Sequence, residues 1–158
     1  MAEIAIPFVV RLLGIRERPA SSVRARSRAT PAPQTGTTVA PATVVTLIKQ
    51  GLPSAAFDLL CEALEVPRER LSRLVNIPAR TLARRKVFKP EESERIYRLG
   101  RLYQRAVDVL GSEADARAWL CAPQKALGGV VPLDYADSEP GAREVEDLLG
   151  QLEHGVFS

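Results

Sequence analysis

Apolar residues recur along this chain at steps of three and four, the spacing that places them on one face of a helix. After Pro53 the steps are i, i+3, i+4, i+7 and i+8, in the set Ala56, Leu59, Leu60, Ala63 and Leu64. Residues 91–110 repeat in a similar way, close to a heptad seam, at Ile96, Leu99, Tyr103, Ala106, Val107 and Leu110. That seam is either core or a self-association face. The pattern predicts an all-α protein, and the low aromatic content of 5% agrees with it.

Prolines and glycines divide this pattern into separate helices. The expected boundaries are Gly51, Pro53, Pro67, Pro78, Pro90, Gly111 and Pro140. Residues 76–78 form a tight break between the third helix and a short, very basic helix that runs from 79 to about 87. Three helices with a turn of a few residues between the last two are the signature of a helix-turn-helix.

The two sides of the short basic helix differ in character. Ala79, Leu82 and Ala83 share one side of a helical wheel and are expected to pack on the preceding helix. The other side is polar, as a recognition helix requires, because its outer face must fit the major groove and donate to phosphates and base edges. The expected DNA-binding residues are Arg80, Thr81, Arg84, Arg85 and Lys86. The alternative is a solvated basic face without a ligand, which is common on surface helices.

The net charge of +3 conceals a strong asymmetry along the chain. Residues 1–50 carry seven Lys or Arg and two Asp or Glu, and residues 51–110 carry twelve and eight. Residues 111–158 carry three basic and nine acidic residues. A basic middle followed by an acidic end indicates a polyanion as the partner of one and a different partner for the other.

Composition divides the chain into three parts. Residues 1–42 are expected to be a flexible basic arm, since residues 18–42 hold four prolines, four arginines and no acid. Residues 43–110 form the helix-turn-helix region with its long following helix, and residues 111–158 form a smaller helical region. The apolar run in residues 4–10 is too short for a bilayer and is not preceded by basic residues, so neither a membrane span nor a secretory signal is expected.

No pattern of residues points to catalysis. Cys61 and Cys121 lie on expected helices without a CxxC motif, so they are assigned to helix packing in a reducing cytoplasm rather than to a disulfide or a zinc site. The single histidine, His154, has no nucleophile or carboxylate paired with it by any motif. Gly128 and Gly129 are typical of a turn, since no helix N-terminus of the expected form follows them. The chain is therefore expected to be non-enzymatic, with no metal and no cofactor.

Four segments occur in a recognisable order. They are A-R-T-L-A-R-R-K at 79–86, P-E-E-S-E-R-I-Y-R-L at 90–99, A-x-x-W-L-x-x-P-x-x-A-L-G-G-x-x-P-L-D at 116–134 and G-A-R-E-V-E-D-L-L-G-Q-L-E-H-G-V-F-S at 141–158. Over about residues 43–158 the chain resembles the Xre/MbcA/ParS-type antitoxins. The C-terminal elements are the specific part of the resemblance, because a helix-turn-helix segment alone is common.

The resemblance implies a bacterial type II toxin–antitoxin pair. The partner is then a RES-domain toxin that consumes NAD. Such an antitoxin forms a homodimer within a larger hetero-oligomer, covers the toxin's active site with its C-terminal segment, and represses its own operon by binding operator DNA. The toxin-binding residues that this implies are Glu153, His154, Gly155, Val156, Phe157 and Ser158. Residues 111–158 thus become a toxin-binding region, in a cytoplasmic protein without a membrane partner.

The residues themselves are consistent with these implications. A site for an anionic dinucleotide should be rich in arginine, and the acidic end of the chain, with Val156 and Phe157 as apolar anchors, complements such a site. Trp119 is expected in the core of the toxin-binding region rather than in the contact. The alternative is a stand-alone helix-turn-helix transcriptional regulator whose C-terminal region only mediates oligomerisation. A RES-type reading frame beside the gene would decide for the antitoxin.

Overall fold

The computed structural model describes residues 8–15 and 39–155, and its elements are helices throughout. In chain order they are α1 Phe8–Leu12, α2 Pro41–Gln50, α3 Ser54–Leu64, α4 Arg68–Leu74, α5 Ala79–Arg84, α6 Pro90–Leu110, α7 Glu113–Leu120, the 3₁₀ helix Lys125–Leu127, α8 Pro132–Tyr135 and α9 Glu139–His154. The prediction of an all-α fold is confirmed.

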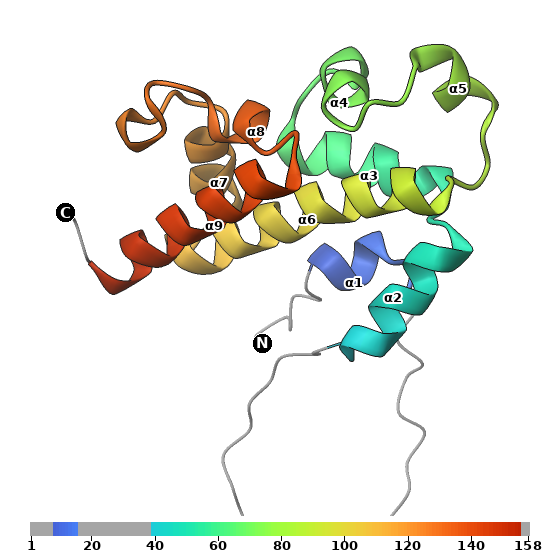
Figure 1. The fold of residues 1–158 in the computed structure, drawn as a ribbon, viewed down its shortest axis with the longest axis horizontal. Coiled ribbons are helices and arrows are strands. Elements are labelled where there is room, and N and C mark those ends of the chain that lie inside the picture. The colour runs from blue at the N-terminus through green and yellow to red at the C-terminus, as the bar shows by residue number, and fades with distance from the viewer. Residues whose placement is uncertain (1–7, 16–38, 156–158) are drawn as a thin grey trace, which may run out of the picture.

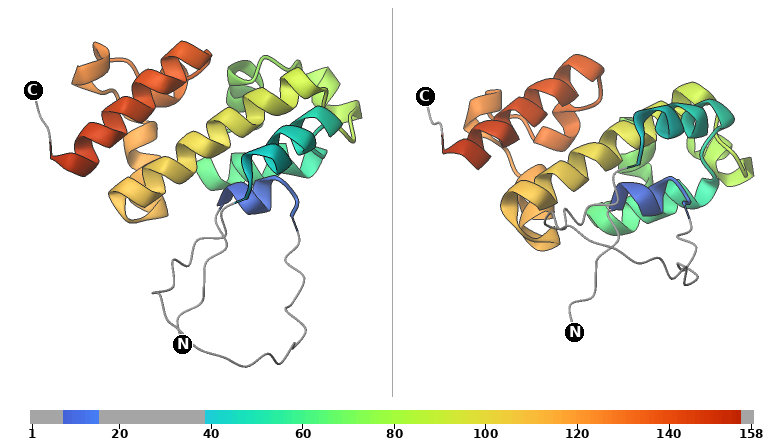
Figure 2. Two further views of the ribbon diagram at one scale, coloured as in Figure 1. Left: turned by 60° about the horizontal axis from the view of Figure 1, so that its bottom comes forward. Right: turned by 90° about the horizontal axis from the view of Figure 1, so that it is seen from below.

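The long helix α6 is the element around which the others are arranged (Figure 1). It contacts α1, α2, α3, α7 and α9. Figure 2 shows α9 along one side of α6 and α1 and α2 on another. Ile96, Leu99, Leu102 and Ala106 of α6 are buried beneath these neighbours. The seam residues Ile96, Leu99, Tyr103 and Ala106 are therefore core of the single chain, whereas Val107 and Leu110 are half-buried.

Residues 8–15 correct the expectation of a flexible arm over residues 1–42. They form α1 and its final turn, and the ring of Phe8 packs edge-on against Tyr103 with ring centroids 4.9 Å apart. A Cβ on Gly100 would lie 2.3 Å from Leu12 Cδ2, so a glycine in α6 lets α1 approach closely. The apolar side chains of residues 8–13 thus form a packing face, whereas residues 1–7, which include the start of the apolar run, and residues 16–38 lie outside the described residues.

The helix-turn-helix consists of α4, a short turn and α5, and it rests on α3 and α6. Asn76 adopts a left-handed conformation with φ +51°, which asparagine tolerates better than most residues, and this reverses the chain between α4 and α5. Ile77 of the turn is buried, and its amide donates to the carbonyl of Ser72 at 3.0 Å. The Arg95 guanidinium of α6 donates to the Val75 carbonyl at 2.6 Å, which fixes the turn to the long helix.

The C-terminal region is built from α7, α8 and α9 against the second half of α6. Ser112 caps α7 by accepting the Asp115 amide at 3.1 Å, the bond that a serine at this position of a helix provides. Gly128 and Gly129 have φ of +69° and +83° and form the expected turn, which glycine permits without strain. A Cβ on Gly141 would lie only 1.9 Å from the Tyr135 carbonyl oxygen, so the end of α8 packs directly on the α9 backbone.

Candidate DNA-binding and toxin-binding surfaces

Helix α5 is shorter than the sequence pattern indicates. It ends at Arg84, because Arg85 is extended, with φ −87° and ψ 133°. The following residues pair instead with the segment before α3: the Ser54 amide donates to the Lys86 carbonyl at 2.9 Å. The Phe88 amide donates to the Leu52 carbonyl, also at 2.9 Å. Lys86 therefore belongs to the loop after the recognition helix and not to the helix.

The apolar side of α5 packs less closely than expected. Leu82 is buried, but Ala79 and Ala83 are exposed, so the prediction that all three pack on the preceding helix is wrong for the two alanines. Both alanines face α4 across a shallow cavity of about 130 Å³, which they line together with Arg68 and Glu69. A single leucine thus anchors a helix of six residues, since alanine side chains do not reach across that gap.

The basic residues expected to bind DNA fall into two groups. Arg80, Arg84 and Lys86 are exposed, and within residues 8–15 and 39–155 none of them forms an ion pair. Thr81 and Arg85 are half-buried. The Arg85 guanidinium is bound to the Glu92 carboxylate, whose side chain is only 12% exposed. The first group presents free donors at the surface of α5 and its following loop, as phosphate or base contacts require.

A series of ion pairs joins α6 to α9. Arg98 Nε lies 3.0 Å from Glu139 Oε2, Arg101 Nε lies 2.7 Å from Glu146 Oε1, and Arg105 lies 2.5 Å from Glu153 Oε2. The residue numbers of the paired side chains rise together along the two helices, so α6 and α9 run parallel. Partial burial tends to raise the pKa of Glu139. The hydrogen bond from Arg143 and the charges of Arg101 and Arg98 outweigh this, so the pKa is lowered.

These ion pairs were not anticipated from the sequence, although a signal was present. Arg98, Arg101 and Arg105 share one face of α6 at helical spacing. The glutamates of α9 recur every seven residues, at Glu139, Glu146 and Glu153. The arginines step by three and four and these glutamates by seven, so the sequence shows two oppositely charged faces but not which residues pair.

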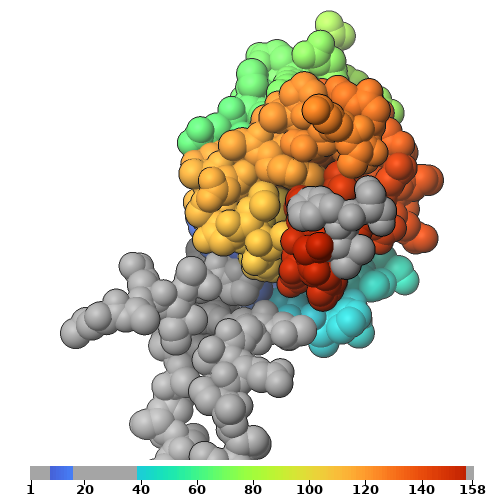
Figure 3. Space-filling view, turned by 90° about the vertical axis from the view of Figure 1, so that its left-hand side faces the viewer, coloured from blue at the N-terminus to red at the C-terminus, as the bar shows by residue number. Residues whose placement is uncertain are grey.

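The residues expected to bind the toxin lie at the end of α9. Glu153 is tied to Arg105, whereas the side chain of His154 is 73% exposed. Gly155 ends the helix in a left-handed conformation, with φ +65°. Figure 3 shows this end of α9 at the surface, next to the second half of α6. Val156, Phe157 and Ser158 lie outside the described residues.

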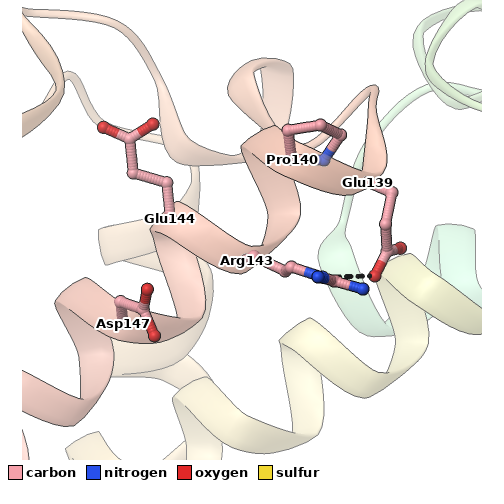
Figure 4. Close-up of a pocket in the computed structure, with 5 residues that line it drawn as sticks. All are labelled: Glu139, Pro140, Arg143, Glu144 and Asp147. Atoms are coloured by element: carbon pink, nitrogen blue, oxygen red, sulfur yellow. Dashed lines mark hydrogen bonds and ion pairs between the residues drawn. The ribbon is translucent and has the colours of Figure 1, made fainter.

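The outer face of α9 carries Glu144 and Asp147, the two acids of this helix that are not paired with α6. Glu139, Pro140, Arg143, Glu144 and Asp147 line an open hollow of about 560 Å³ (Figure 4). Glu144 accepts a hydrogen bond from the Tyr135 hydroxyl at 2.8 Å, and this bond raises the pKa of Tyr135. Asp147 has no cationic partner in the part of the chain that the structure describes. This face and the helix end together form the acidic surface of the C-terminal region.

Trp119 and Val130 of the C-terminal region are both in contact with solvent. Trp119 is half-buried and packs against the core, so it is neither fully internal nor free. Val130, which follows the Gly128-Gly129 turn, is 41% exposed.

Neither membrane insertion nor metal binding has a structural basis in the described ranges. None of the helices in residues 8–15 and 39–155 combines the length and apolar character needed to cross a bilayer. The same residues contain no group of three potential metal ligands from His, Cys, Asp and Glu.

Both halves of the chain match known protein domains. Residues 43–101 match the antitoxin Xre-like helix-turn-helix domain, and residues 105–155 match the antitoxin Xre/MbcA/ParS C-terminal toxin-binding domain. The class of protein is therefore a DNA-binding antitoxin with a separate domain for its toxin.

Similar proteins extend over most of the chain. It is 39% identical over 145 residues to Antitoxin Xre of Yersinia enterocolitica, which covers 89% of this chain and 95% of that protein. It is 32% identical over 117 residues to Antitoxin Xre of Photorhabdus laumondii, covering 71% and 79%. A Sphingobium protein named Prs ADP-ribosylating antitoxin is 28% identical over 125 residues, with 71% and 79% coverage. The chain belongs to the Xre/MbcA/ParS antitoxin family, which is a non-enzymatic family of type II antitoxins.

Proposed function

We propose that this type II antitoxin neutralises a RES-domain toxin that consumes NAD, by covering the toxin's active site with the end of α9 and residues 156–158. The observation that carries this proposal is the exposed end of α9 within the toxin-binding domain, directly before Val156 and Phe157. A helix end that projects from a packed region presents the residues after it to a concave partner. An aromatic side chain such as Phe157 is a typical anchor for such a pocket.

The charge of α9 also supports toxin binding at this end of the chain, but through acidic residues other than Glu153. An active site for an anionic dinucleotide is basic, and it favours acids that have no partner within the antitoxin. Glu139, Glu146 and Glu153 already bind arginines of α6. The outer acids Glu144 and Asp147 are therefore the better candidates for steering the toxin, while Glu153 fixes the helix end.

Operator binding is proposed for α5 and its following loop. We infer that Arg80, Thr81, Arg84 and Lys86 contact the duplex and that the antitoxin represses its own operon in the cytoplasm, as a homodimer within a larger complex with the toxin. The donors of Arg80, Arg84 and Lys86, exposed and unpaired in the described part of the chain, support their contacts, whereas Thr81 is half-buried beside them. The match of residues 105–155 to a toxin-binding domain disfavours the alternative of a stand-alone regulator, whose C-terminal region would only oligomerise.

The experiment is co-expression of the antitoxin with a RES-domain toxin, followed by measurement of cellular NAD. Removal of residues 153–158 should restore NAD loss and growth arrest, because the segment that covers the active site is gone. The matched control is Gln151→Ala on the exposed side of α9, which should still protect. Binding of operator DNA by the shortened chain should be unchanged. Full protection by the shortened chain would show that another surface blocks the toxin.

A further inference from the structure

We propose that Arg85, although it directly follows the recognition helix in the basic segment 80–86, does not contact DNA. It is a positioning residue that ties the end of α5 to the start of α6 through Glu92. The inference rests on the proposed role of α5 in operator binding, and it separates one arginine from the DNA-binding residues that the sequence predicts.

Glu92 is the centre of this arrangement. Its carboxylate accepts the guanidinium of Arg85 and, through Oε2, the Lys89 amide at 2.9 Å. The Glu92 side chain is 12% exposed and that of Arg85 is 26% exposed, so solvent reaches the pair only partly. A carboxylate in such a position needs its cation, because removal of one partner leaves the other buried and unneutralised. Arg85 could therefore reach a phosphate only by abandoning Glu92.

The backbone around the pair is held as well. The carbonyl of Lys86 and the amide of Phe88 are both hydrogen-bonded to the segment before α3, and the Phe88 side chain is buried. The whole connection from α5 to α6 is thus fixed to the core on both sides of the Arg85 side chain. Since Leu82 is the single buried side chain of α5, the ion pair supplies the second attachment that sets the direction of this short helix.

Arg84 is the matched comparison, because it is the same residue type one position earlier. It is exposed and forms no ion pair with any described residue. If Arg84 binds a phosphate and Arg85 does not, the two arginines will differ in salt dependence. A plot of log K for DNA binding against log salt has a negative slope. Removing one arginine–phosphate interaction lowers the magnitude of this slope by about 1.

The test measures operator affinity at several salt concentrations for Arg84→Ala, Arg85→Ala, Glu92→Gln and the double variant Arg85→Ala/Glu92→Gln. Glutamine at position 92 still accepts the Lys89 amide, so the substitution removes the charge and keeps the cap. Arg84→Ala should weaken binding about tenfold and lower the slope by about 1. Arg85→Ala and Glu92→Gln should each weaken it about three- to tenfold at unchanged slope, and the double variant should be no weaker than either.

Glu91→Gln is the control for charge, since Glu91 is an exposed neighbour of Glu92 and its neutralisation should not weaken binding. A direct DNA contact by Arg85 predicts the opposite pattern: Glu92→Gln would free the guanidinium and leave affinity unchanged or higher, and Arg85→Ala would lower the slope. That result overturns the inference.

Failure of the DNA-binding proposal is distinguishable from failure of this inference. If the unaltered chain does not bind its operator, or if Arg84→Ala does not change the operator affinity, the assignment of the α5 face to DNA binding is wrong. The positioning role of Arg85 is then judged by thermal melting of the same variants without DNA. Melting temperatures of Arg85→Ala and Glu92→Gln that fall together and do not add in the double variant support it, and fully additive decreases contradict it.

Discussion

The two halves of the molecule use arginine in opposite ways. In the helix-turn-helix, Arg80 and Arg84 are exposed and unpaired among the described residues, whereas in the second half of α6 Arg98, Arg101 and Arg105 each bind a glutamate of α9. Arg80 and Arg84 keep their charge available to a partner, although Arg85 beside them is bound to Glu92. The three arginines of α6 join two helices. A count of charges along the chain cannot tell these uses apart, because it does not show which charges neutralise one another.

The difference changes the interpretation of the acidic end. Residues 111–158 carry nine acids, but three of them are paired with α6. Since the toxin-binding region is fastened to the same helix that supports the helix-turn-helix turn, the two surfaces share α6 as a common framework. A substitution in the buried face of α6 should therefore affect both surfaces. A substitution at a site that belongs to only one half should affect only that half.

The largest effect is expected from Ile96→Ala, because Ile96 is fully buried in the helix that both halves share. The substitution should lower the free energy of unfolding by about 2–5 kcal/mol through reduced burial and a new cavity. Chemical denaturation measures this, with Val45→Ala as the control, since Val45 is 50% exposed. Loss of toxin binding with normal DNA binding would contradict a shared framework.

Gly141→Ala should disturb the C-terminal half alone. The added methyl would meet the Tyr135 carbonyl at 1.9 Å, so α8 and α9 must separate. We expect a loss of stability of about 1–3 kcal/mol and weaker toxin binding, with operator affinity retained. Gly150→Ala on the same helix is the matched control, because nothing lies within 4 Å of its added Cβ. It should raise stability by up to about 1 kcal/mol. Equal effects of the two substitutions in denaturation curves would refute the close packing of α8 on α9.

Arg101→Ala tests the ion pairs between α6 and α9. Its side chain is 39% exposed and that of Glu146 is 27% exposed, so solvent screens the interaction. The loss should be only about 0.2–1 kcal/mol, and it should shrink at high salt. Denaturation at low and high ionic strength measures it, with Lys49→Ala on exposed α2 as the control. A loss that is independent of salt would indicate packing of the arginine stem rather than its charge.

The last comparison concerns the reactivity of the two cysteines, one in each half. Burial and the nearby charges of Glu69 and Glu62 raise the pKa of Cys61 from 9.0 to about 11. Burial also raises the pKa of Cys121, but the charge of Arg70 opposes this. At pH 8 Cys61 should therefore react with a thiol reagent about 100-fold more slowly than an unperturbed thiol, and more slowly than Cys121.

The sign of the pH dependence follows from the same shift. Because the folded chain retains the Cys61 proton up to about pH 11 while the unfolded chain loses it near pH 9, stability should fall as pH rises through this range. Mass-spectrometric labelling at each site measures the rates, with the unfolded chain as reference. Equal labelling of Cys61 in folded and unfolded protein would exclude the shift.

Helical periodicity predicted the buried residues better in the longer helix α3 than in the short helix α5. Ala56, Leu60 and Leu64 are buried as expected, whereas Phe57 was missed although it is fully buried. The spacing describes one narrow face, but α3 is enclosed on more than one side. In α5 the same reasoning was correct only for Leu82, because a six-residue helix held by its neighbours need not bury the whole face that a wheel suggests.

The sequence by itself determined the all-α class, the helix-turn-helix and the capped start of α7, because periodicity, proline and capping residues act over a few positions of the chain. Only the tertiary structure decided which charges are free, since ion pairs such as Arg85 with Glu92 and Arg105 with Glu153 depend on how helices meet. It also decided that residues 8–15 belong to the core. Local patterns record what a segment can form, and packing determines which of its side chains remain available to a partner.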